Sequence, residues 1–132
     1  MRSMRDARTT GQSMVEFALI LPILVLILIG LFDAGRAIYA YNTVSNSARA
    51  GARVGIVDQN TARIKDAAKE KAAGLGLTNG DVTATVCTTL ACPISVTVVY
   101  DFTPVTPIVG DLFNPQISST ASMPMERKYV SP

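Results

Sequence analysis

The chain has 132 residues, which is enough for one small domain and one further element. Its formal net charge is only +2, and the surplus lies in the first ten residues, so the remainder has no basic face of the kind that binds nucleic acid. Histidine is absent, which removes the commonest general base near neutral pH and the commonest metal ligand. We therefore expect no metal site, no cofactor and no nucleic-acid partner.

The first predicted element is an apolar helix near the N-terminus. Phe17–Phe32 is an uncharged run whose length as a helix is ~24 Å, and flanking residues extend it to a transmembrane segment of about residues 15–38. A removable secretory signal is the alternative, although its small-residue cleavage site would have to use Gly35–Ala37. The basic residues before the run favour a cytoplasmic N-terminus, with the rest of the chain outside the membrane. They are Arg2, Arg5 and Arg8.

A glycine and a glutamate five positions later precede the apolar run. The segment from Gly11 to Phe17 reads GQSMVEF and resembles the processing site of type IV prepilins and pseudopilins. The resemblance implies that a membrane-embedded aspartyl peptidase cuts between Gly11 and Gln12. Glu16 is then the fifth residue of the mature chain.

Glu16 lies where a carboxylate is costly unless it finds a partner. We expect Glu16 of one subunit to pair with the freed Gln12 amine of a neighbour, which would set the axial register between two apolar helices. The alternative is a boundary carboxylate that extends toward the lipid head groups.

Pro22 lies inside the predicted helix and removes the hydrogen bond to the Ala18 carbonyl. A bend or a loosened turn is expected there. Two interpretations remain open. Pro22 is either a proline tolerated in a transmembrane helix or a flexible point that helps subunits leave the bilayer.

The helix is predicted to continue beyond the membrane to about Val57. Small residues recur four apart in this part, at Ser47, Gly51 and Gly55. Such positions allow another backbone to come close. We expect them to pack against the chain's own sheet, with a neighbouring subunit as the alternative partner.

The stretch from Val15 to Gly55 resembles the N-terminal signature of the TadE-like proteins, a pseudopilin branch of the tight-adherence (Tad) pilus system. The ending Ala121–Glu126 also resembles the last strand of that family. Pro124 departs from the pattern and suggests an edge position or an early end. The residues that match the N-terminal signature are Val15-Glu16-Phe17-Ala18, Leu21-Pro22, Gly30-Leu31, Gly35-Arg36, Tyr41 and Ala48-Arg49-Ala50-Gly51-Ala52-Arg53.

This resemblance implies a structural or assembly subunit of a Tad-type type IV pilus that a prepilin peptidase processes. The implied partners are other pilin and pseudopilin subunits, the prepilin peptidase, the inner-membrane assembly platform and membrane lipid. The implied location is the inner membrane, with a single pass, a cytoplasmic N-terminus, an extracytoplasmic C-terminal domain and possible incorporation in a pilus.

The remaining chain predicts a small extracytoplasmic domain. Asn60 or Thr61 can cap a second helix, Ala62–Ala73, and Gly74 or Gly76 can end it. Alternating residues predict a hairpin and then a third strand. The three predicted strands are Val82–Cys87, Ile94–Tyr100 and Gln116–Met123.

The predicted fold class is therefore α+β and pilin-like: one long helix, half of it transmembrane, a short helix and a small antiparallel sheet of about three strands. The predicted divisions are a basic leader at residues 1–11, the long helix at 12–58 and the outer domain at 59–132.

Cys87 and Cys92 are five positions apart around the predicted hairpin loop. Outside the cytoplasm they are expected to form a disulfide, and two free thiols are the alternative. A zinc site would need more ligands than these two thiols.

No nucleophile and base can be paired in the sequence. Without histidine, a hydrolase would need a Ser–Lys arrangement, and Lys65, Lys69 and Lys71 lie on a charged helix. We expect neither an enzyme nor a small-molecule substrate. The alternative to a pilus subunit is a single-pass, membrane-anchored binding or sensor module that is not processed.

Overall fold

The computed structural model describes residues 4–86, 92–106 and 115–125. The fold is α+β, as predicted, with a long N-terminal helix, a short second helix and a three-stranded antiparallel sheet. In chain order the elements are α1 (Met4–Val57), α2 (Thr61–Lys71), the short 3-10 helix η1 (Ala73–Leu75), β1 (Val82–Thr85), β2 (Pro93–Asp101) and β3 (Gln116–Pro124).

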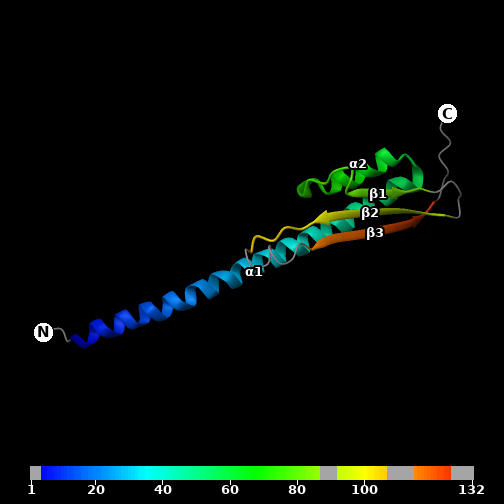
Figure 1. The fold of residues 1–132 in the computed structure, drawn as a ribbon. Helices are drawn as coiled ribbons and strands as arrows, with labels where there is room; N and C mark the ends of the chain where they lie inside the picture. The colour runs from blue at the N-terminus through cyan, green and yellow to red at the C-terminus, as the bar shows by residue number, and fades with distance from the viewer. Residues whose placement is uncertain (1–3, 87–91, 107–114, 126–132) are drawn as a thin grey trace.

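Helix α1 is a rod of 54 residues. At ~1.5 Å per residue its length is close to 80 Å. Its N-terminal half projects away from the rest of the molecule, while its C-terminal half lies against α2 and the sheet (Figure 1). Residues four apart share one face of a helix. On this face the second half of α1 carries a buried stripe of small and β-branched side chains: Ala40, Val44, Ala48 and Ala52.

The sheet has the strand order β1-β2-β3, and both neighbouring pairs are antiparallel. Val96 in the central strand pairs with Ala84 on β1 and with Ala121 on β3. Alternate residues of a strand point to one face, and on β2 the inward residues Ile94, Val96 and Val98 are fully buried. The two helices cover this face, with α1 against β2 and β3 and with α2 against β1. The outer domain is therefore a two-layer structure.

The second helix begins as predicted and ends earlier. The side chain of Asn60 caps it by accepting from the Ala62 amide over 3.0 Å. The predicted end at Ala73 is wrong, because the Ala72 amide donates to the Lys69 carbonyl and the chain tightens into η1. Gly76, with a φ of 65°, then ends this run in the left-handed region that favours glycine.

The strands also follow the expected pattern. β3 is an edge strand and ends at Pro124, which is the role suggested for this proline. β1 ends at Thr85 rather than at Cys87. Cys87 itself lies outside the described residues.

Candidate functional site

The N-terminal half of α1 is not covered by any other part of the chain that the structure describes. Apolar side chains from Met14 to Phe32 are exposed around the helix, and Leu19 and Leu31 are each 69% exposed. Within the described part of the chain, one helix region, Gly11–Val57, is long and apolar enough to cross a membrane. None of its most apolar stretch is buried in the molecule. A helix that is apolar all round needs an apolar environment on every side. Its length, composition and exposure are those of a single membrane anchor.

Gly11, Gln12 and Glu16 lie in the first turns of this anchor, where α1 is already helical. The Gln12 side-chain amide donates to Glu16 Oε1 over 3.5 Å, which is a long bond between two exposed groups one turn apart. No atom lies within 4 Å of the position that a Cβ on Gly11 would take. The space beside Gly11 is therefore open, and among the described side chains Glu16 has only this weak partner.

Pro22 lies in the exposed part of the anchor. α1 continues through this residue as one unbroken helix. The expected bend or flexible point therefore stays a prediction.

Asp33, at the end of the apolar run, binds the segment that follows β2. The Val105 amide donates to both carboxylate oxygens over 3.0 Å. Thr106 donates to Oδ2 through its amide over 2.8 Å and through its hydroxyl over 2.5 Å. Asp33 and Thr106 are each only 8% exposed. An ionised carboxylate has only acceptors, so Asp33 supplies partners to backbone donors that an irregular segment cannot pair within a helix or a sheet.

Arg36, nearly one turn further along α1, supports the same segment. Its Nη1 lies 3.3 Å from Asp33 Oδ1 and donates to the Thr103 carbonyl over 3.5 Å. Its guanidinium carbon lies 5.4 Å from the centre of the Phe102 ring, within the range of a cation–π contact. The segment after β2 reaches back along α1 to make these contacts (Figure 1).

This cluster was not predicted from the sequence. Val105, a partner of Asp33, is 72 positions further along the chain, so no local pattern connects the two residues. The one available signal is that Asp33 and Arg36 are three apart on a predicted helix, which puts their side chains on one face.

Ser47, Gly51 and Gly55 face the interior of the outer domain. The Ser47 hydroxyl is buried and donates to the Ala68 carbonyl over 2.6 Å. A Cβ on Gly51 would lie 3.2 Å from the Ala68 Cβ, and a Cβ on Gly55 would lie 2.8 Å from Ile94 Cγ2. These three residues therefore pack α1 against α2 and the sheet of the same chain, not against a neighbour.

The predicted disulfide involves Cys87, which lies outside the described residues, so the pairing with Cys92 stays a prediction. In the described ranges no three histidine, cysteine, aspartate or glutamate residues gather as a metal site would require.

Residues 11–53 match a family model described as TadE-like protein. The match begins at Gly11, covers the bare anchor and ends among the small residues that face α2 and the sheet. It confirms the resemblance drawn from the sequence over about a third of the chain. No curated protein and no solved structure matches the chain.

Proposed function

We propose that this chain, TadE-like over residues 11–53, is a pseudopilin that serves as a structural or assembly subunit of a Tad-type type IV pilus. The observation that carries the proposal is the bare anchor headed by Gly11, Gln12 and an exposed, weakly partnered Glu16. In a soluble protein, so long an apolar helix would have to be buried against other parts of the molecule. In a pilus subunit, the same helix can contact lipid in the bilayer and the helices of neighbouring subunits in the filament.

The proposed orientation is a single pass through the inner membrane. The N-terminal leader contains three arginines within eight residues, and such residues are retained in the cytoplasm. The sheet and α2 then lie on the extracytoplasmic side. The length of α1 supports this arrangement, because the rod can cross the ~30 Å hydrocarbon core and still carry the domain beyond it.

Processing is proposed to occur between Gly11 and Gln12. A protease needs access to the backbone of its substrate, and here that backbone is helical. Glycine weakens a helix by about 1 kcal/mol relative to alanine, and Gly11 has no neighbour that would hold it in place. The helix can therefore open locally at this bond at a small cost.

The cut has an electrostatic consequence. It removes the basic leader and leaves a positive amine on Gln12, one turn before the carboxylate of Glu16. In an apolar surrounding, the cheapest arrangement pairs each such carboxylate with an amine. Pairing between neighbouring subunits fixes how far one anchor slides along the next, which apolar contacts alone leave undetermined.

The proposed partners are other pilin and pseudopilin subunits, the prepilin peptidase, the inner-membrane assembly platform and the lipid around the anchor. The proposal gives the chain no catalytic role and no small-molecule substrate.

Mass spectrometry of the native protein from membranes and from sheared pili tests the processing step. A mature chain that starts at Gln12 is the expected result. A Gly11→Leu variant is expected to keep its leader, because the larger side chain obstructs the protease. An intact Met1 in wild-type cells with an active prepilin peptidase would contradict the proposal and favour an unprocessed anchored module.

The role of Glu16 is tested by pilus assembly in a Glu16→Ala strain. The variant is expected to enter the membrane, be processed and fail to support normal pili, because it lacks the partner for the Gln12 amine. Glu70→Ala is the matched control, since it removes an exposed carboxylate from α2. Normal pili in the Glu16→Ala strain would contradict the role in register.

A further inference from the structure

The segment after β2 carries an exposed apolar side chain to the outer end of the anchor. Its last described residues, 103–106, lie closer to the anchor than the other described parts of the outer domain (Figure 1). The Val105 amide donates to Asp33 over 3.0 Å, yet Val105 remains 59% exposed. Asp33 directly follows Phe32, the last residue of the apolar run. Val105 therefore lies at the level where the apolar surface of the anchor ends.

The level of Asp33 in a bilayer follows from the length of the anchor. With Met14 at the inner edge of the hydrocarbon core, the helix from Met14 to Phe32 covers ~27 Å. This is nearly the whole ~30 Å of the core, so its outer edge falls at Asp33. The head-group layer adds about 5–8 Å on each side of the core. Val105, which binds Asp33, lies in this layer.

The polar groups around Val105 are paired within the chain, so they do not oppose a place among the head groups. A carboxylate near lipid is costly unless it finds partners. Asp33 accepts hydrogen bonds from Val105 and Thr106, and Arg36 Nη1 lies 3.3 Å from its Oδ1. The donors and the balancing charge thus come from the chain itself. The segment turns its polar groups toward α1 and leaves the valine side chain exposed.

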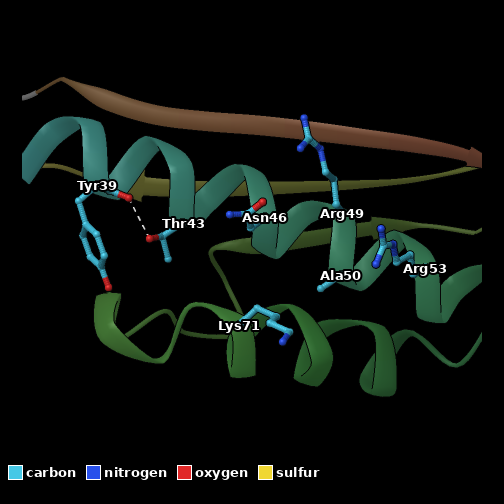
Figure 2. Close-up of a pocket in the computed structure, with 7 residues that line it drawn as sticks. All are labelled: Tyr39, Thr43, Asn46, Arg49, Ala50, Arg53 and Lys71. Carbon is cyan, nitrogen blue, oxygen red and sulfur yellow. Dashed lines mark hydrogen bonds between the residues drawn. The ribbon is translucent and has the colours of Figure 1, made fainter.

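The first turns of α1 beyond Asp33 also carry exposed apolar groups. Ile38, Tyr39 and Tyr41 are exposed, and a turn of about 100° per residue points them in three different directions. The Tyr39 ring extends from α1 toward the chain after α2 (Figure 2). Tyrosine is enriched at membrane–water interfaces. A lipid layer that surrounds the helix accounts for exposed groups on several sides, whereas one docked protein would cover a single side.

We propose that the segment at residues 103–106 lies in the head-group layer on the outer side of the membrane, with the Val105 side chain in contact with lipid. The inference rests on the proposed single-pass orientation and goes beyond it. The outer domain then touches the membrane at a point beside α1, in addition to α1 itself. Because Val105 lies to one side of the helix axis, this contact favours one direction of tilt for α1.

The chain contains no tryptophan, so one introduced tryptophan reports on its own surroundings. The full-length Val105→Trp chain is placed in phosphatidylcholine vesicles and in vesicles of the same lipid brominated near the head-group end of its acyl chains, because bromine quenches tryptophan on contact. Val105→Trp is expected to lose at least about half of its emission in the brominated lipid, since a ring at this level meets the upper part of the chains. Circular dichroism checks the fold.

Val57→Trp is the matched control. Val57 is 60% exposed, as Val105 is, but it lies at the far end of α1, ~36 Å beyond Asp33. Its tryptophan is expected to keep its emission in the brominated lipid. Equal quenching at the two positions would overturn the proposal, because the contact would then not be specific to the segment. A blue-shifted but unquenched Val105→Trp would also overturn it, since the ring would then lie against protein.

Leu28→Trp, within the exposed apolar run, reports on the anchor separately. Quenching of Leu28→Trp without quenching of Val105→Trp would overturn this inference and leave the single-pass anchor standing. An unquenched Leu28→Trp would overturn both. Neither result depends on processing at Gly11 or on pilus assembly.

A tryptophan itself prefers the interface, so the wild-type chain is tested as well. A phospholipid with a photoreactive group near its head group is expected to label residues 103–106, located by fragmentation in the mass spectrometer, and to leave Val57 unlabelled. Absence of label from residues 103–106, with label on the anchor, would overturn the proposal.

Discussion

The carboxylate of Asp33 accepts hydrogen bonds from two consecutive amides and a hydroxyl, and no apolar side chain could replace it. Its position is also informative. Asp33 directly follows the bare anchor, so the first contact between α1 and the outer domain is made by a charge that an apolar surrounding would reject. The residue therefore holds the segment after β2 at the end of the apolar run.

The variant Asp33→Asn tests the hold of this carboxylate on that segment. The asparagine side chain would offer a single neutral acceptor, so the amides of Val105 and Thr106 are expected to exchange hydrogen at least about tenfold faster than in wild type. Hydrogen–deuterium exchange of the detergent-solubilised chain measures this change. Asp66→Asn is the control, because it removes an exposed carboxylate from α2. Unchanged protection of the two amides would show that the segment is held by other contacts.

Gly55 makes the closest approach between α1 and the sheet. In Gly55→Ala the new Cβ would lie 2.8 Å from Ile94 Cγ2, which branches directly from Cβ and cannot withdraw. The free energy of unfolding is expected to fall by about 1–3 kcal/mol, the usual cost of overpacking. Urea unfolding followed by circular dichroism measures this change.

Gly35→Ala is the matched control in the same helix. No atom lies within 4 Å of its new Cβ. It is therefore expected to leave stability unchanged or to raise it by up to about 1 kcal/mol through helix propensity. Equal losses in the two variants would show that α1 is sensitive to any added methyl group rather than to contact with Ile94.

The helices and strands were predictable because each depends on a pattern within its own segment. α1 ends at Val57, as expected, where the apolar and small residues give way to Asp58, Gln59 and Asn60. The alternation along β2 is visible in its residues and reappears as buried and exposed positions. The early end of α2 was not predictable in this way, because it depends on the backbone bond from Ala72 to Lys69.

The turn before β1 gives the outer domain a dependence on pH. Asp81 Oδ2 accepts from the Thr78 amide over 2.7 Å and from the Thr78 hydroxyl over 2.8 Å. These two bonds hold the pKa of Asp81 below its ordinary value of 3.8, and the bond from the Thr78 amide has the larger effect. Because the pKa is lower in the folded state, the stabilisation is complete above the unfolded pKa and is lost as the pH falls through the folded pKa.

Thermal unfolding between about pH 6 and pH 2 is expected to show this loss as a decrease in Tm. In Asp81→Asn the decrease should be smaller, because the titrating group is absent, and its Tm should lie below that of wild type at pH 6. Parallel pH profiles for the two proteins would contradict the assignment to this turn.

The arrangement of the elements in space was less predictable than the elements themselves. Arg53 and Lys71 are eighteen positions apart in the chain, yet both line one groove where α2 packs against α1. The cluster of Asp33 with Thr106 likewise depends on a segment that continues beyond β2 and meets α1 (Figure 1). Both features join residues far apart in the chain, and periodicity contains no information about such pairs.

The division between a bare anchor and a packed domain predicts that the domain folds without the anchor. Every residue of the buried core cluster, from Val44 onward, is retained in a chain that starts at Asp33. This shortened chain is expected to be soluble without detergent, to give the circular dichroism of an α+β protein and to unfold cooperatively. Aggregation, or loss of cooperative unfolding, would mean that the apolar half also stabilises the sheet.

The unbroken run of α1 from the anchor into the domain has a geometric consequence. Glu16 and Gly55 lie on one rod about 60 Å apart, at ~1.5 Å per residue. Successive residues turn the helix by about 100°. If a neighbour contacted the anchor one residue away from the proposed position, the sheet would therefore face a different direction about the axis of α1. The proposed pairing of Glu16 with a neighbour would therefore also set which face of the outer domain each subunit presents.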